Sequence, residues 1–450
     1  MREECAVENN MTTGPIRRQI VLFTIPIMLS ILLQQLYNMV DTIIVGNFVG
    51  ENALASVGTS TPVTALFIAV ATGMSTGCSI IISQMFGAKQ TENIKRAVST
   101  ALILNGALGL VFTAVAYAAA GFIFSVMLNL DAALLADAVT YFHIYCLGLL
   151  FQFLYNAAAA ILRSVGDSKA SLYFLLASSV TNIILDLVFI LCFRMGVAGA
   201  ALATVLSQAL ACVLSLVYMH RKYEFLRLSL SELRFDREMG ALALKLGIPV
   251  ALQQCVVSLG QLAVQRLVNT FGMTSGYTAA IRLENIVLIP VFGLNAGMAT
   301  FAGQNIGARR EDRVSKGLRN TLVIGLACCA VLGVVCVLFA PELVSLFGVS
   351  GFGLTVGSGY IRFCAPCYLL FCAYMITNAV LQGTGDVNFT MFNSLSGLAI
   401  RCIFAYTLAF FTPLSYTALW ISVPISWAYS LVLSIVRYKG RKWLAKAVIQ

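Results

Sequence analysis

The sequence predicts an all-α integral membrane protein in which twelve transmembrane helices form two pseudo-symmetric six-helix lobes around a central cavity. Of its 450 residues, 59% are hydrophobic and only 11% are charged, whereas a soluble chain carries about 25% charged residues. Apolar segments of about 20 residues, each long enough to span the hydrocarbon core as a helix, recur along the chain. Motifs in the first half of the chain return in the second half, which predicts two related lobes.

The apolar segments define twelve spans, and an even number places both termini on the same side of the membrane. The expected parts are a cytoplasmic N-terminus (1–17), an N-lobe (18–219), a cytoplasmic linker (220–242), a C-lobe (243–437) and a cytoplasmic tail (438–450). The predicted spans are 18–45, 54–84, 97–120, 136–160, 166–193, 197–219, 243–269, 277–303, 318–340, 357–381, 389–411 and 415–437.

Charged residues in the loops predict the orientation. The loops opposite the termini contain Glu51, Asp131 and Glu342 but only one arginine, Arg194. The positive-inside rule therefore predicts a multi-pass membrane protein with both termini in the cytoplasm. The net charge of +10 follows from this distribution and requires no nucleic-acid partner. Basic residues on the side of the termini are Arg17, Arg18, Lys89, Lys95, Arg96, Arg163, Lys169, Arg309, Arg310, Arg313, Lys316 and Arg319, with those of the linker and tail.

The repeat relates the two halves of the chain at a nearly constant spacing. The Gly-x-x-x-Gly motif at 73–77 returns at 293–297, and the motif at 162–167 returns at 381–386. Because each copy contains six helices, the copies run parallel and are related by an axis along the membrane normal. The Gly-x-x-x-Gly motifs predict tight packing between helices.

Three carboxylates lie well inside the predicted spans: Asp41, Asp186 and Glu284. A charged residue near the bilayer centre costs about 2.5–3.5 kcal/mol, so such a residue indicates a functional site. Asn182 lies one helical turn before Asp186, which makes their side chains neighbours. Carboxylate, amide and hydroxyl oxygens suit a hard monovalent cation or a proton in a desolvated pocket. The alternatives are a snorkelling side chain at Asp41 and a structural ion pair at Asp186.

At these motifs the chain resembles the bacterial branch of the multidrug and toxic compound extrusion (MATE) family. The resemblance covers about residues 15 to 440 and rests on the order and spacing of segments 36–42, 84–88, 162–167, 182–186 and 196–204. The resemblance implies an N-lobe cation site at Asp41, Asn182, Asp186 and Thr204, where Na+ is a possible ligand, with Tyr37 and Asn156 nearby and a helix hinge at Pro26. One branch of the family has coupling acids in its seventh and tenth helices, where this chain has apolar residues near Val257 and Phe371.

The resulting functional hypothesis is a secondary active antiporter. It would export cationic or amphipathic organic compounds in exchange for Na+ or H+, with no cofactor besides this coupling ion. Its expected partners are a small-molecule substrate and membrane lipid, and we expect a monomer. An enzyme is disfavoured because the sequence contains no metal-ligand cluster, P-loop or nucleophile–histidine arrangement.

The substrate is only weakly specified by the sequence. Aromatic and methionine side chains suit flat organic cations, although they also serve as packing residues. Four C-lobe arginines either snorkel at helix ends or line the cavity and favour an anionic or zwitterionic substrate. If they line the cavity, a lipid-linked oligosaccharide flippase of the same superfamily becomes the alternative function. Glu284 is either a substrate contact or the partner of Arg266 or Arg401. The candidate substrate contacts are Glu284, Met39 and Gln34; the aromatic and methionine residues are Tyr37, Met39, Phe153 and Tyr155; the arginines are Arg266, Arg282, Arg362 and Arg401.

Overall fold

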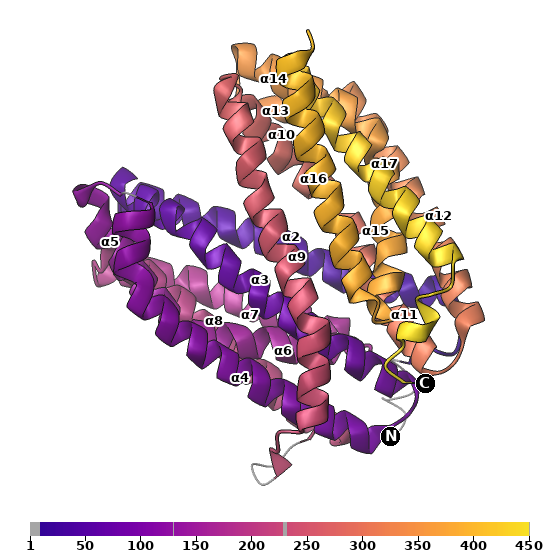
Figure 1. Cartoon of the computed structure of the whole chain (residues 1–450). Helices are drawn as coiled ribbons and strands as arrows, with labels where there is room; N and C mark the ends of the chain where they lie inside the picture. Colours follow the sequence, from indigo (N-terminus) through magenta and orange to yellow (C-terminus); the bar gives the residue numbers. More distant parts are fainter. Residues whose placement is uncertain (1–9, 129, 228–231, 450) are drawn as a thin grey trace. The chain divides into compact units, whose positions relative to one another are not determined.

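The computed structural model describes residues 10–128, 130–227 and 232–449, and within these ranges it contains helices and no strands (Figure 1). The helices of the first half are α2 (Ile16–Phe48), α3 (Glu51–Gly87), α4 (Thr91–Phe122), α5 (Ala132–Leu147), α6 (Leu149–Ser164), α7 (Ser168–Leu187) and α8 (Gly196–Lys222). Those of the second half are α9 (Arg237–Thr270), α10 (Thr274–Val287), α11 (Ile289–Gly307), α12 (Glu311–Leu338), α13 (Ala340–Ser345), α14 (Gly351–Cys364), α15 (Tyr368–Gly383), α16 (Val387–Phe411) and α17 (Thr417–Lys439).

Short π-helical or 3-10 segments extend or join several of these helices. The π-helices η1 (Ile123–Met127) and η2 (Val188–Cys192) follow α4 and α7 directly, and the 3-10 helix η5 (Ala365–Cys367) joins α14 to α15. The 3-10 helices η3 (Glu224–Leu226) and η6 (Leu444–Lys446) follow α8 and α17. The π-helix η2 begins two residues after Asp186, which belongs to the site described below.

Among the described residues, ten spans are long and apolar enough to cross a membrane, or twelve when each of two bent helix pairs counts as one span. The prediction of an all-α protein with about twelve spans is therefore confirmed. The bent pairs are α5 with α6, at 46°, and α10 with α11, at 45°. These bent pairs cover the spans predicted at 136–160 and 277–303.

A glycine stands at the first bend and a proline at the second. At Gly148, between α5 and α6, an added Cβ would lie 2.9 Å from a side-chain carbon of Val205, so a larger residue does not fit. Pro290 lies in the first turn of α11. A proline has no backbone N–H to donate to the preceding turn, which favours a helix end just before it.

The chain divides into two compact units, which are described separately. The first unit contains Leu29–Ala251, and the second contains Met11–Met28 together with Leu252–Gln450. The divisions fall inside α2 and α9, three residues after Pro26 and Pro249 respectively, rather than in the predicted linker 220–242. The first half of each of these helices therefore packs with the other helices of one unit, and its second half with those of the other.

The Gly-x-x-x-Gly motifs form close helix contacts inside each unit. In the first unit, a Cβ added to Gly73 of α3 would lie 2.4 Å from the Cα of Ala251 on α9, and one added to Gly77 would lie 2.5 Å from the backbone N of Gly247. In the second unit, a Cβ on Gly293 of α11 would lie 2.4 Å from the side chain of Met28 on α2. The predicted role of these glycines in tight packing is confirmed.

The repeated Gly-Asp pairs form matching turns after α6 and α15. Gly166 and Gly385 have φ values of 92° and 96°, a left-handed conformation that glycine adopts without steric cost. Asp167 then caps α7 by accepting a hydrogen bond from the Ala170 backbone N–H at 3.1 Å. Its second oxygen accepts hydrogen bonds from Tyr218, Lys222 and Tyr223, which fastens the end of α8 to this turn.

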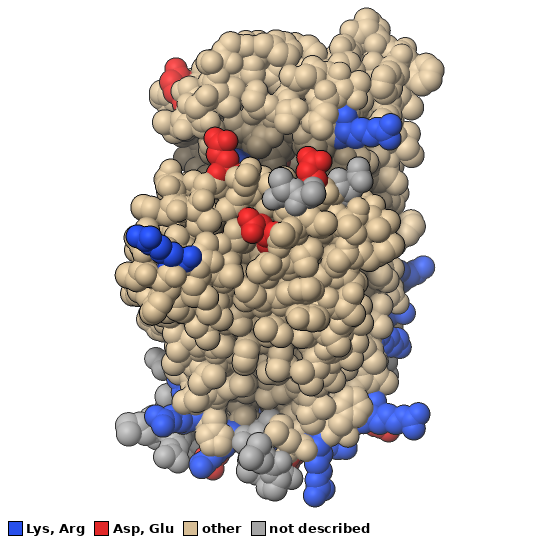
Figure 2. All heavy atoms as spheres, turned by 90° about the vertical axis from the view of Figure 1, so that its left-hand side faces the viewer, with Lys and Arg blue, Asp and Glu red and all other residues tan. Residues whose placement is uncertain are grey.

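Much of the described surface is uncharged. On the face shown in Figure 2, uncharged residues form a wide area, and Lys and Arg side chains gather toward its lower edge. Large apolar side chains are exposed on many helices, including Leu110 and Val111 of α4 and Val331 and Val334 of α12, each more than half exposed. Exposed apolar surface of this extent suits contact with lipid rather than water.

Candidate cation-coupling site

The first unit brings together four residues that the sequence nominates. Asp41 comes from α2, Asn182 and Asp186 come from α7, and Thr204 comes from α8. Asn182 and Asp186 are fully buried, and Thr204 is 6% exposed. These side chains meet because α7 packs closely along α8, and because Asp41 approaches the face of α7 that carries Asn182 and Asp186.

Asn182 connects the two helices that hold it and Thr204. In the amide orientation that pairs both of its ends, its nitrogen donates to Oδ2 of Asp186 at 2.9 Å and its oxygen accepts from the backbone N–H of Thr204 at 3.3 Å. The Thr204 hydroxyl donates to the carbonyl oxygen of Ala200 at 3.1 Å, so its lone pairs remain directed away from that carbonyl. Asn182 therefore holds Asp186 in place and leaves part of its carboxylate uncommitted.

The two carboxylates are the acidic groups of the site, and they lie next to each other. Asp41 and Asp186 interact directly with each other, and Oδ1 of each is buried without a hydrogen-bond partner. Two ionised carboxylates repel each other in a desolvated pocket, and an unpaired buried acceptor is costly. A shared proton or a bound monovalent cation relieves both penalties at once, which is what this arrangement can do chemically.

Two tyrosines, Tyr37 and Tyr141, lie near the carboxylate pair, and a third, Tyr145, stacks on Tyr141. Tyr37 lies one turn before Asp41 on α2 and is close to Thr204, Asp41 and Asp186. Tyr141 and Tyr145 of α5 are 8% and 6% exposed, and their rings stack with centroids 6.2 Å apart. Tyr141 lies close to both Asp41 and Asp186. The hydroxyls add neutral oxygen ligands and proton donors to the site.

Tyr141 and Tyr145 were missed by reasoning from the sequence. Their signal is present, since two tyrosines four residues apart share one face of a helix. The sequence could not show that this face lies near Asp41 and Asp186, because those two residues lie on other helices. Asp137, at the edge of the predicted span 136–160, is a further carboxylate of α5, but its side chain is exposed.

Other nominated residues occupy different surroundings. Asn156 of α6 donates to the carbonyl oxygen of Gln152 on its own helix at 2.8 Å. Pro26 is buried in the half of α2 that belongs to the second unit. Gln34 and Met39 of α2 are exposed. Phe153 is fully buried and stacks on Phe112 with centroids 5.6 Å apart, so it is a packing residue rather than a substrate contact.

The second unit places the remaining nominated acid, Glu284 of α10, in a separate polar cluster. Its Oε2 accepts a hydrogen bond from the Tyr360 hydroxyl of α14 at 3.1 Å. Arg401 of α16 donates from Nη2 to the Tyr277 hydroxyl of α10 at 3.1 Å. The alternative in which Glu284 pairs with Arg266 or Arg401 does not take the form of a direct ion pair, because no described basic side chain lies within ion-pair distance of it.

The four C-lobe arginines differ in burial. Arg266, Arg282 and Arg362 are exposed, which agrees with snorkelling or loop positions. Arg401 is partly buried, and its Nε is buried without a hydrogen-bond partner. Only one of the four therefore contributes charge to the interior of the second unit, which weakens the argument for an arginine-lined binding surface.

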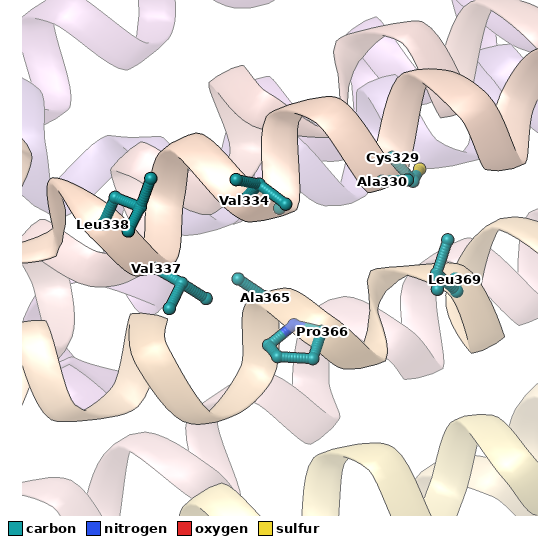
Figure 3. A pocket seen from close by; sticks show the side chains of 9 residues that line it. Cys329, Ala330, Val334, Val337, Leu338, Ala365, Pro366 and Leu369 are labelled. Atoms are coloured by element: carbon teal, nitrogen blue, oxygen red, sulfur yellow. The ribbon is translucent and has the colours of Figure 1, made fainter.

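A cavity of about 330 Å³ lies in the second unit (Figure 3). It is bounded by α12 on one side and by η5 with the start of α15 on the other, and Val337, Ala365 and Pro366 lie around its middle. Its lining is almost entirely apolar, with the Cys329 thiol as the most polar side chain. It therefore offers no ligands for a cation.

Comparisons with known proteins find relatives that match nearly the whole chain. The family model MatE matches residues 26–188 and 249–407, once in each half of the repeat. The probable multidrug resistance protein YpnP of Bacillus subtilis is 29% identical over 97% of this chain and 98% of its own. The probable multidrug resistance protein YoeA of the same organism is 29% identical over 99% and 98%. A solved structure, an outward-facing multidrug resistance MATE family transporter of the MOP superfamily, matches with a TM-score of 0.88 and 26% identity over 97% of each chain.

Proposed function

Since this chain belongs to the MATE family and is a multi-pass membrane transporter, we propose that it exports organic, cationic or amphipathic compounds in exchange for Na+ or H+. The observation that carries the proposal is the pair Asp41 and Asp186, whose Oδ1 atoms are buried and unpaired. The relatives named as multidrug resistance proteins support drug export as the physiological role and do not favour the lipid-linked oligosaccharide flippase.

The proposed cycle begins with a cation that enters the site from outside the cell. Na+ would be held by Asp41, Asp186 and the Thr204 hydroxyl, and by the Asn182 oxygen once its amide group turns that oxygen toward the carboxylates. A proton would be shared between the carboxylates. Binding neutralises the pair jointly, because each carboxylate raises the affinity of the other for a positive charge. Loss of repulsion between α2 and α7 then changes the preferred conformation of α2.

Pro26 is the proposed hinge for that change. It lacks a backbone N–H, so α2 already has a weakened hydrogen-bond ladder at this point. The division between the two units falls within three residues of it. Bending of α2 here would allow the carboxylate-bearing half to move with the first unit and expel the substrate. Coupling requires only that the cation and the substrate prefer different conformations.

The driving force is adequate for export against a gradient. Movement of one elementary charge through the membrane potential supplies about 2.3 kcal/mol per 100 mV. We propose that the transporter works as a monomer in the cytoplasmic membrane of a bacterium, with both termini in the cytoplasm, as the distribution of Lys and Arg in the loops supports.

The test is efflux of a fluorescent organic cation from energised membrane vesicles, with Na+ and pH gradients imposed separately. Wild-type protein should show efflux under at least one gradient, and Asp41→Asn should abolish it. Asp131→Asn is the matched control, because Asp131 is an exposed loop carboxylate whose side chain caps no backbone group. Wild-type efflux that persists in Asp41→Asn would contradict the cycle. Absence of efflux under either gradient, in correctly inserted protein, would favour the flippase.

A further inference from the structure

The polar cluster of the second unit consists of Glu284, Tyr277, Tyr360, Tyr368 and Arg401. Tyr360 and Tyr368 are fully buried, and Tyr277 is 7% exposed. The rings of Tyr277 and Tyr360 pack edge to face with centroids 5.6 Å apart. Arg401 donates to the Tyr277 hydroxyl, and the Tyr360 hydroxyl donates to Glu284. Each tyrosine of this aromatic pair is therefore hydrogen-bonded to one charged side chain. A guanidinium and a carboxylate are held around the same buried tyrosines without touching.

The cluster occupies the repeat counterpart of the coupling site. The starts of α14, α15 and α16 follow those of α5, α6 and α7 at one constant spacing, which is also the spacing between the motifs at 162–167 and 381–386. At this spacing Tyr360 is the counterpart of Tyr141, and Arg401 is the counterpart of Asn182. The position of Asp186 is taken by Ala405, which is fully buried and cannot ionise. The two units therefore carry polar clusters at equivalent places but with different charges.

The polar clusters of the two units differ in their charged side chains. The site of the first unit has two carboxylates and no basic side chain among its described neighbours. The cluster of the second unit has one carboxylate and one guanidinium. Burial works against an ionised Glu284, and the groups that favour its charge are Arg401, Tyr360 and Tyr368, with Tyr277, Cys364 and Cys336 nearby. Among these described neighbours, only Arg401 carries a charge at neutral pH.

We propose that Arg401 is a tethered cation that replaces a transported cation in the second unit. Its guanidinium compensates Glu284 permanently, so Glu284 stays ionised and this unit takes up neither a proton nor a metal ion. Arg401 is thereby the residue that confines coupling to the first unit. This role depends on the proposed antiport, although the charge state of Glu284 can be measured without transport.

The chemistry of the two groups supports this assignment. A guanidinium remains protonated in proteins and cannot leave the site as Na+ or H+ would. A charge held in the interior requires a compensating partner, and breaking such a pair by removing one member is strongly unfavourable. The attraction between the guanidinium and the carboxylate acts through space, and it is stronger in a low-dielectric interior than in water. Without Arg401, Glu284 among these tyrosines would have to be neutralised by a proton.

The test is infrared difference spectroscopy of the purified protein in lipid nanodiscs at neutral pH. Subtraction of the Glu284→Gln spectrum isolates the Glu284 signal from those of Asp41 and Asp186. Wild-type protein should show carboxylate bands from Glu284 and no protonated carbonyl band. In Arg401→Asn, which installs the residue of the counterpart position, the carboxylate bands should be lost and a Glu284-dependent protonated carbonyl band should appear. Arg401→Lys should retain the carboxylate bands.

Two results would overturn the proposal. One is a protonated Glu284 carbonyl band in the wild-type protein, a measurement that needs no variant of Arg401. The other is an unchanged carboxylate signal in Arg401→Asn, which would mean that Arg401 does not set the charge of Glu284. Arg282→Asn is the matched control, since Arg282 is an exposed arginine two residues from Glu284, and its spectrum should match wild type. Failure of drug efflux would refute the proposed function but leave these spectra unaffected.

Discussion

The carboxylates of Asp41 on α2 and Asp186 on α7 interact directly, and Oδ1 of each is buried without a hydrogen-bond partner. Folding brings them together from helices far apart in the chain and leaves their repulsion uncompensated by any described basic side chain. A pair of this kind is expected to be less stable empty than occupied. A substitution that removes one of the two charges should therefore lower transport activity and raise the stability of the empty protein.

Replacement of Asp186 by Asn should abolish gradient-driven efflux and raise thermal stability in the absence of coupling cation. The amide removes one charge of the repelling pair while keeping the shape of the side chain. Efflux should fall at least tenfold, and the unfolding midpoint in detergent should rise. Thermal unfolding with and without Na+, and at two pH values, checks the second part. A variant that loses activity together with stability would indicate a structural role instead.

Replacement of Tyr141 by Phe should weaken binding of the coupling cation without unfolding the protein. The variant removes one hydroxyl near Asp41 and Asp186 and keeps the ring that stacks on Tyr145. We expect this hydroxyl to act as a neutral oxygen ligand of the bound cation, and loss of such a contact to a charged group corresponds to about 1.5–3 kcal/mol, or roughly a tenfold or greater loss of affinity. The cation concentration that gives half-maximal efflux measures the change. Tyr173→Phe is the control, because Tyr173 is a 61% exposed tyrosine of α7.

Replacement of Gly73 by Ala should destabilise the first unit, whereas Gly58→Ala on the same helix should not. The new Cβ at Gly73 would lie 2.4 Å from backbone atoms of Ala251, so α3 and α9 must separate. Overpacking of this kind costs about 1–3 kcal/mol. A Cβ at Gly58 meets nothing within 4 Å, and alanine favours a helix over glycine. Equal unfolding midpoints for the two variants would contradict the close contact.

Asp236 gives a stability effect with a defined pH dependence. It precedes α9, and its Oδ1 accepts hydrogen bonds from the backbone N–H groups of Met239 and Glu238, while Oδ2 pairs with Arg96. The hydrogen bond from the Met239 N–H is the largest of the effects that lower the pKa of Asp236, and Arg96 adds to it.

A carboxylate whose pKa is lowered by folding stabilises the protein above its unfolded pKa, about 3.9, and loses this effect as pH falls through the folded value. Asp236→Ala should therefore lower stability by about 1 kcal/mol at neutral pH through loss of the helix cap. The difference from wild type should stay constant down to about pH 4 and shrink below it. Unfolding midpoints measured across that range test this, and a difference that grows on acidification would contradict it.

Several features of the molecule follow from local sequence alone. Runs of apolar residues predict the spans because a helix must satisfy its own backbone hydrogen bonds in lipid. The pairing of Asn182 with Asp186 is predictable because residues four apart share a helix face. The repeat correctly relates the Gly-x-x-x-Gly contacts of α3 and α11, because small residues at this spacing permit close approach of two helices.

Contacts between helices were decided only by the tertiary structure. The sequence could not show that Tyr141 belongs beside Asp41, or that Phe153 packs in the core, because neither depends on the spacing within one helix. It could not separate Arg401 from three exposed arginines, since all four lie in similar apolar surroundings along the chain. Burial of a charge and the partners that compensate it are set by which helix faces meet, and local periodicity does not specify that.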